Sequence, residues 1–216
     1  SEMCIRDSAQ NIAQAIALAQ PKRVVISTSG WVVDEPDSPL QSPTESAIAT
    51  LIREVRQTGV SLAVVAPRLF FENLLNPVVL GPVKTQGILC YPLRADYPVS
   101  WSSHLDVAEV VERLLIDTSV TGLVGVGQSP AITGMDLAKG FAGYLNLPVA
   151  FNSLEPEAFG AMIAPLFGAG AAAGVVAGYQ AQALASANNI VEETSSQRLL
   201  GLTPLTFQQW LAEIAV

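Results

Sequence analysis

The stretch VSLAVVA (residues 60–66) is apolar nearly throughout, as is typical of a strand whose two faces are both covered by helices. Two similar runs flank it in the chain, RVVI (residues 23–26) and GLVGVG (residues 122–127). Amphipathic segments at residues 48–57 and 107–116 separate the three runs. Strands that alternate with helices predict a parallel sheet with right-handed crossovers. We therefore expect residues 23–26 and 60–66 to lie side by side and to run in the same direction.

Helix starts carry their own signals. Ser42, followed by Pro43 and Glu45, predicts an N-cap, a first helical residue and a capping box. The same type of signal recurs three times along the chain: Ser103 with Asp106, Thr133 with Asp136, and Thr206 with Gln209. Shorter strand-like pieces are expected at residues 88–91, 99–101 and 149–152.

The chain contains no Gly-x-Gly-x-x-Gly loop after an early strand, because no strand precedes Arg23. We therefore expect a partial doubly wound parallel sheet of Rossmann type, with its first strands missing, over residues 9–130. A small, mostly helical C-terminal lobe is expected over residues 131–216. Residues 1–8 have no helical or strand period and resemble a translated sequencing adapter. The alternative is an ordinary disordered N-terminus; our prediction is a truncated chain that begins with a non-native scar.

Composition excludes several classes of function. Half of the 216 residues are apolar and the net charge is −8, with no basic patch of the kind that binds nucleic acid. A single histidine, His104, and two cysteines, Cys4 and Cys90, leave no metal cluster and no disulfide framework. Few cysteines also favour a reducing compartment, and hence the cytoplasm.

Residues 158–191 contain no charged side chain, so a membrane helix is one interpretation of this segment. Its many Ala and Gly residues and the interruption at Pro165 favour a tightly packed or oligomer-forming helix instead. Gly170, Gly174 and Gly178 repeat every four residues and would form a small-residue face. We expect no membrane span, and we consider this face a possible homo-oligomer contact.

Taken together, these segments resemble the NmrA-like, atypical branch of the short-chain dehydrogenase superfamily. RVVISTSG (residues 23–30) is similar to the family's fourth strand, and residues 58–74 are similar to its fifth strand and substrate loop. Residues 91–108 and 133–138 resemble later segments of the same branch. The resemblance spans roughly residues 11–210. It implies a Rossmann domain that binds NADP or NAD, without showing which.

In open parallel sheets, ligands bind beyond the carboxyl ends of the strands. There, the hydroxyls of Ser27, Thr28 and Ser29 and the backbone of Gly30 are expected to contact a nicotinamide or its ribose; the alternative is an ordinary polar strand end. The second group of proposed coenzyme contacts follows the next strand and consists of Ala66, Pro67, Arg68, Leu69 and Phe70. Arg68 is either a ligand for a phosphate or substrate, or a solvated loop charge.

Four further residues are proposed to form the wall of a pocket for a flat, apolar substrate: Trp31, Phe71, Asn73 and Trp101. The alternative for the aromatic side chains is a place in the core. No catalytic residue can be assigned from the sequence. His104 is a weak possibility as a proton donor, and its other interpretation is simply a residue at a helix start.

Two departures from the family pattern limit the expected chemistry. Ala66 stands before Pro67, where the family usually has Arg. No Tyr or Lys occurs in residues 30–66, and none of the four tyrosines has a Lys four positions later. The usual Tyr–Lys proton relay is thereby ruled out. We expect the full-length parent to be an NAD(P)H-dependent oxidoreductase that reduces a quinone or small carbonyl, and this chain alone to be inactive. The alternative is a non-catalytic NAD(P) sensor.

Overall fold

The computed structural model describes residues 2–214, and its centre is a three-stranded parallel sheet. Strands β1 (Val24–Ser27), β2 (Leu62–Pro67) and β4 (Gly122–Val126) lie in the order β1-β2-β4. Val24 pairs with Leu62, and Ala63 pairs with Gly122. The expected parallel pairing of the first two strands is therefore confirmed.

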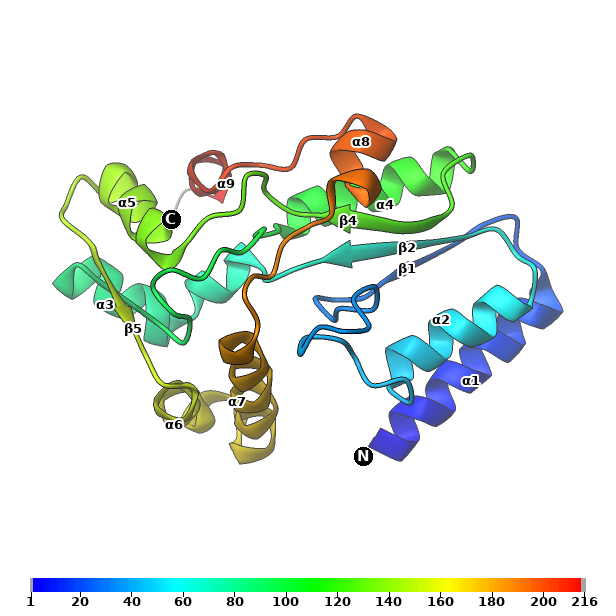
Figure 1. Ribbon diagram of the computed structural model, residues 1–216, viewed down its shortest axis with the longest axis horizontal. Coiled ribbons are helices and arrows are strands. Elements are labelled where there is room, and N and C mark those ends of the chain that lie inside the picture. Colours follow the sequence, from blue (N-terminus) through cyan, green and yellow to red (C-terminus); the bar gives the residue numbers. More distant parts are fainter. Residues whose placement is uncertain (1, 215–216) are drawn as a thin grey trace.

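Helices cover both faces of this sheet (Figure 1). Helices α1 (Glu2–Ala19) and α2 (Ala47–Gln57) lie on one face, and α4 (His104–Ile116) lies on the other. Side chains of β2 alternate between the two layers: Leu62 and Val64 pack toward α1 and α2, and Ala63 and Val65 pack toward α4. Because both faces of β2 are buried, its sequence is an uninterrupted apolar run.

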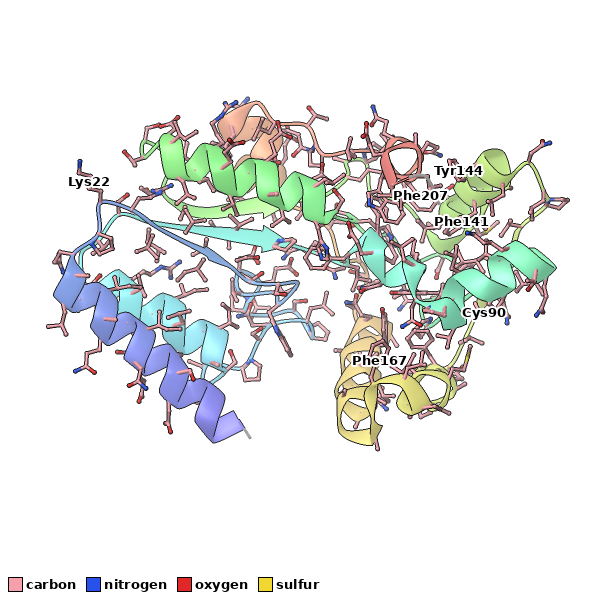
Figure 2. All side chains as sticks on the ribbon, turned by 180° about the vertical axis from the view of Figure 1, so that it is seen from behind. Lys22, Cys90, Phe141, Tyr144, Phe167 and Phe207 are labelled. Carbon is pink, nitrogen blue, oxygen red and sulfur yellow. The ribbon has the colours of Figure 1, made fainter. Side chains whose placement is uncertain are left out.

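A second lobe is built around two more parallel strands, β3 (Ile88–Tyr91) and β5 (Ala150–Ser153). Its other elements are η1 (Phe71–Leu75), α3 (Pro77–Gln86), α5 (Gly134–Leu145), α6 (Pro156–Phe167), α7 (Ala169–Leu184) and α9 (Phe207–Ile214). Phe141 of α5 and Phe207 of α9 meet edge to face with ring centroids 5.1 Å apart (Figure 2). Aromatic contacts of this kind run through the core of the lobe.

The chain passes between the two lobes more than once. β3 comes from residues 9–130, yet its partner β5 comes from residues 131–216. Beyond α7, the chain returns to the first lobe through η2 (Glu192–Thr194) and α8 (Ser196–Leu200), where Ser195 bridges Gly125 of β4. Each lobe therefore draws on both of the ranges expected from the sequence.

Three of the four expected capping boxes are confirmed. The side chains and backbones of Ser103 and Asp106, of Thr133 and Asp136, and of Thr206 and Gln209 hydrogen-bond reciprocally. The prediction for Ser42 is wrong, because Ser46 caps α2 and accepts a hydrogen bond from the Ala49 N–H. The Ser42 N–H donates to the Val32 carbonyl instead, and this bond holds Ser42 in the preceding loop.

Two other local expectations are also corrected. Residues 2–8 belong to α1, although their sequence shows no clear helical period; that residues 1–8 are a scar remains a prediction. Residues 99–101 form no strand. Val99 makes only isolated bridges, to Ile132 and Asn188.

The glycine-rich segment forms two helices, because Gly168, with φ +85°, ends α6 before α7 begins. Within the described residues, no helix has the length and apolarity needed to cross a membrane. Helices α6 and α7 approach each other at Gly160, where a Cβ atom would overlap Val176. Gly170, Gly174 and Gly178 are exposed, and open space surrounds the place that a Cβ atom would take at each of them. Of the two alternatives expected for this helix, tight packing or oligomer formation, this face shows no tight packing within the chain, and oligomer formation remains a prediction.

Candidate functional site

The carboxyl ends of β1 and β2 approach each other closely. Gly30, three residues beyond β1, has φ +91°, and a Cβ atom there would stand 3.2 Å from the Arg68 carbonyl oxygen and 3.8 Å from Phe70. Glycine tolerates both the left-handed backbone and the close approach. The segments that sequence analysis assigned to a coenzyme are thus adjacent in space.

Ser102 fastens the ends of β2 and β4 together. Its fully buried hydroxyl accepts from the Arg68 N–H at 2.9 Å and donates to the Val126 carbonyl at 2.7 Å. Its backbone pairs with Leu69 and Phe71. Sequence analysis missed this residue, because one serine in a loop carries no signal of a role that depends on strands distant in sequence.

Thr28 directly follows β1, and its polar side-chain group has no partner. Its side chain is 1% exposed, and its hydroxyl forms no hydrogen bond within the described residues. Its backbone N–H continues the sheet by donating to Val65. An unpaired buried hydroxyl is costly, so this atom is suited to a ligand that supplies a partner. Ser27 and Ser29 are exposed on either side of it.

The other proposed coenzyme residues differ in accessibility. Ala66 and Pro67 are buried and lie in the ladder opposite Gly125 and Val126. Leu69 and Phe70 are partly exposed beyond the strand. Of the five proposed coenzyme residues from Ala66 to Phe70, these two offer surface to a ligand.

Arg68 is not a solvated loop charge. Its side chain is 1% exposed, and its guanidinium pairs with Asp34 at 3.4 Å and with Glu35 at 2.9 Å. Its Nε–H donates to the Asn189 carbonyl at 3.2 Å. The guanidinium is thus occupied by protein acceptors. The sequence did not show this, because Asp34 and Glu35 read as loop charges far from β2.

The four proposed substrate residues divide into two pairs. Phe71 and Trp101 are fully buried and stack in the core with centroids 5.8 Å apart, so neither presents surface to a substrate in this conformation. Trp31 is 59% exposed and Asn73 is also exposed. The structure therefore places Trp31 and Asn73 at the surface and the other two in the core.

His104 is exposed, begins α4, and packs its ring against Phe70 with centroids 4.6 Å apart. The backbone N–H of His104 donates to the Glu72 carboxylate at 2.9 Å, and Glu72 also accepts from the indole N–H of Trp210 at 3.2 Å. Glu72 thereby links η1 to α4 and α9, a second role that sequence analysis missed. His104 lies beside the proposed coenzyme residues, but its imidazole nitrogens form no hydrogen bond within the described residues.

No tyrosine lies at the carboxyl ends of β1, β2 and β4, and Tyr91, which ends β3, belongs to the second lobe. Tyr91, Tyr97 and Tyr179 lie in the second lobe, where burial raises the pKa of Tyr91 to about 12. Burial likewise raises the pKa values of Tyr97 and Tyr179. These hydroxyls are held protonated, the opposite of what a relay tyrosine requires. Tyr144, on α5, is part of the second lobe as well.

Two hollows lie away from the strand ends. One, of about 70 Å³, is lined by residues of the second lobe that include Arg94 and Gln182. The other, of about 300 Å³, is an open groove between α1 and α2 beside Ala13 and Glu54. Among the described residues, no group of three His, Cys, Asp or Glu side chains could hold a metal ion.

A glycine pattern of the phosphate-binding type does occur, but in another setting. Residues 168–173 read Gly-Ala-Gly-Ala-Ala-Ala, which fits the relaxed Gly-x-Gly-x-x-Ala form. In the structure this string opens α7 directly after α6, with no strand before it. The strand–turn–helix context that gives the pattern its meaning is therefore absent here.

Comparison with known proteins shows the fold. No protein-family model and no curated protein sequence matches the chain. A nucleoside-diphosphate-sugar epimerase from Staphylococcus aureus matches with TM-score 0.73 at 15% identity, over 94% of this chain and 69% of that one. An NADPH-dependent quinone oxidoreductase from Escherichia coli matches with TM-score 0.70 at 13% identity, over 100% and 80%. A Citrobacter triphenylmethane reductase complexed with NADP(H) matches with TM-score 0.79 at 15% identity, over 100% and 73%.

These structures share the Rossmann-like α/β architecture of NAD(P)-binding reductases and epimerases. The fold class expected from the sequence is thus confirmed, and so, at the level of the fold, is the resemblance. Fold alone does not assign a reaction, because one fold supports many chemistries.

Proposed function

We propose that the chain forms the nicotinamide end of the coenzyme site of an NAD(P)H-dependent oxidoreductase of the NmrA-like type. One observation carries the proposal. At the carboxyl end of β1, beside the approach of Gly30 to Arg68, the buried Thr28 hydroxyl has no partner. Strand ends of parallel sheets are where such coenzymes bind.

The residues at the strand ends suit this end of the coenzyme. The Thr28 hydroxyl and the backbone at Gly30 would hold the nicotinamide ribose, and backbone groups at Leu69 and Phe70 would hold the carboxamide. When bound, NAD(P)H supplies the hydride. The pyrophosphate has no comparable holder, since no glycine loop follows a strand of this chain. We therefore propose that the chain alone binds dinucleotides weakly and has little activity.

We propose a quinone or another small carbonyl as the substrate, bound as a flat ring near Phe70, Trp31 and Asn73. Trp31 and Asn73 are exposed. Hydride transfer to a quinone requires that two rings be held face to face, without a Tyr–Lys pair. The exposed imidazole of His104, beside Phe70, is the proposed source of the proton for the reduced oxygen.

Thr28→Val tests the proposal, because it removes the hydroxyl and keeps the shape. The variant should be about as stable as the parent or more stable by about 1 kcal/mol, since an unpaired buried hydroxyl is lost. Its affinity for NADPH or nicotinamide mononucleotide in calorimetry should fall about ten-fold. A panel of quinones added with NADPH provides the activity readout. Unchanged affinity in a stable Thr28→Val variant would contradict the proposed site.

A second function is favoured by a different observation. The Tyr–Lys pair is missing, and three of the tyrosines are buried in the second lobe. A protein that senses the redox state of NAD(P) needs binding without proton transfer. Such a sensor should bind oxidised and reduced coenzyme with different affinities and consume neither; equal affinities would eliminate this function.

We also propose that two copies associate through the exposed glycine face of α7. Gly170, Gly174 and Gly178 leave open space where a neighbouring helix would come close. Sedimentation of the purified chain tests this: concentration-independent monomers would contradict it. The low cysteine content supports the cytoplasm as the proposed location.

A further inference from the structure

Arg68 joins two segments that are far apart in the sequence. The first is the loop between β1 and α2, which carries Asp34 and Glu35; the second is the connection between α7 and α8, which carries Asn189. In Figure 1 this connection passes from α7 up to α8 beside the end of β2. Arg68 itself is held at that end, because its backbone N–H donates to the Ser102 hydroxyl.

The ion pairs of Arg68 with Asp34 and Glu35 are the reason that we expect this link to be strong. A guanidinium that is 1% exposed has lost its hydration and needs carboxylate partners to be stable. Asp34 approaches both terminal nitrogens at 3.4 Å, and Glu35 approaches one at 2.9 Å. The planar fork of arginine can serve three acceptors at once. Both carboxylates are partly exposed, at 18% and 26% of their side-chain surface, so the cluster reaches from the interior to the surface of the loop.

Other contacts also bind the α7–α8 connection near the sheet end, and Ser195 bridges Gly125. Asn188 exchanges backbone hydrogen bonds with Pro98 and Ser100, and the Ile190 N–H donates to the Ser100 hydroxyl at 3.1 Å. The Ile190 side chain covers Gly125, where a Cβ atom would lie 2.8 Å from it. Loss of the Arg68 contact is expected to affect how often this connection opens.

We propose that Arg68, paired with Asp34 and Glu35, is a positioning residue that holds the β1–α2 loop and the α7–α8 connection together at the strand ends, so that both segments open as one unit. Arg68 does this in place of binding a phosphate. The link between the segments stands without the proposed function; only its consequence for coenzyme binding rests on that function.

Amide hydrogen exchange tests the link in the complete chain. In Asp34→Asn/Glu35→Gln, the amides of Asn188 and Ile190 should exchange about ten-fold faster or more, although neither residue is changed. Asp37→Asn is the matched control, because it removes an exposed carboxylate from the same loop; it should leave both amides unchanged. Faster exchange confined to residues 31–42 would overturn the proposal.

A triple variant distinguishes loss of the link between the two segments from the destabilisation that a buried, unpaired arginine causes. Asp34→Asn/Glu35→Gln/Arg68→Met removes the cation together with both carboxylates. If Arg68 holds the two segments together, Asn188 and Ile190 still exchange faster than in the parent chain. A return to parental exchange would mean that the double variant suffered only from its unpaired arginine, and would overturn the proposal.

Binding of NADPH by the same variants separates this inference from the proposed function. Faster exchange together with weaker NADPH binding supports both. Faster exchange in a chain whose binding of NADPH is undetectable with or without the substitutions supports the link and counts against the proposed function. Unchanged exchange at Asn188 and Ile190 overturns the link, whatever the coenzyme does.

Discussion

Gly30 lies directly against the backbone of Arg68: a Cβ atom on residue 30 would stand 3.2 Å from the Arg68 carbonyl oxygen. The first residue follows β1 and the second follows β2. This contact brings the ends of neighbouring parallel strands within reach of one ligand, beside the unpaired hydroxyl of Thr28. The candidate site depends on this approach of two loops.

Gly30→Ala should therefore destabilise the fold. Residue 30 has φ +91°, a conformation that costs a residue with a Cβ atom about 1–2 kcal/mol, and its new methyl group would press on Arg68. Urea unfolding measures the change. Gly174→Ala is the control: this exposed position inside α7 has open space, so alanine should stabilise the monomer by about 0.5–1 kcal/mol. Equal effects of the two substitutions would contradict the close approach at Gly30.

In two capping boxes of the same kind, the pKa values of the aspartates should be shifted in opposite directions. Burial raises the pKa of Asp106 above the ordinary carboxyl value of 3.8, despite hydrogen bonds from Ser103 and Leu205. Hydrogen bonds from Thr133 lower the pKa of the more exposed Asp136 below the same value. NMR titration of the two carboxyl groups checks the order. Two midpoints on the same side of 3.8 would contradict the difference in burial.

The contributions of these groups to stability follow from the direction of each shift. For Asp106 the folded pKa is raised, so its favourable contribution is complete below the unfolded pKa and is lost as the pH rises through the folded pKa. For Asp136 the folded pKa is lowered, so its contribution is present above the unfolded pKa and is lost as the pH falls through the folded pKa. Both changes therefore belong to the acid range around the ordinary carboxyl pKa.

The buried hydroxyls of Tyr91 and Tyr179 are hydrogen-bonded to each other. Tyr91→Phe leaves the Tyr179 hydroxyl buried without its partner and should cost about 1–3 kcal/mol. Tyr179→Phe should cost a similar amount, because it leaves the Tyr91 hydroxyl buried without its partner. The double variant should be more stable than Tyr91→Phe alone, as urea unfolding can measure. A double variant whose cost equals the sum of the two single costs would contradict this arrangement.

The three strands of the central sheet were predicted well from the sequence. A strand that is buried on both faces, such as β2, requires a continuous apolar run, and such a run is easy to recognise. The sequence also predicted the capping boxes of Asp106, Asp136 and Gln209, since each is complete within four residues. It misplaced the cap of α2, where both Ser42 and Ser46 suit an N-cap. The bond from Ser42 to Val32 decides between them, and that contact has no local signal.

The candidate site was predicted less completely, for a related reason. Their positions just beyond strand ends were enough to predict that Thr28, Gly30 and Phe70 lie close together. The burial of Arg68 depends on Asp34, Glu35 and Asn189, whose proximity follows from the crossing of loops. Likewise, Phe71 and Trp101 could serve either a pocket or a core, and their mutual stacking assigns them to the core. Composition does not distinguish an aromatic pocket wall from aromatic packing.

The most direct test of the account is an NMR titration of the amide spectrum with NADPH, and with nicotinamide mononucleotide as the fragment that lacks the adenosine half. We expect saturable shifts concentrated at Thr28, Ser29, Gly30, Leu69 and Phe70, with weak affinity for both ligands. Shifts that saturate elsewhere, for instance along the groove between α1 and α2, or no shifts at these five amides at millimolar ligand, would contradict a nicotinamide site at the strand ends.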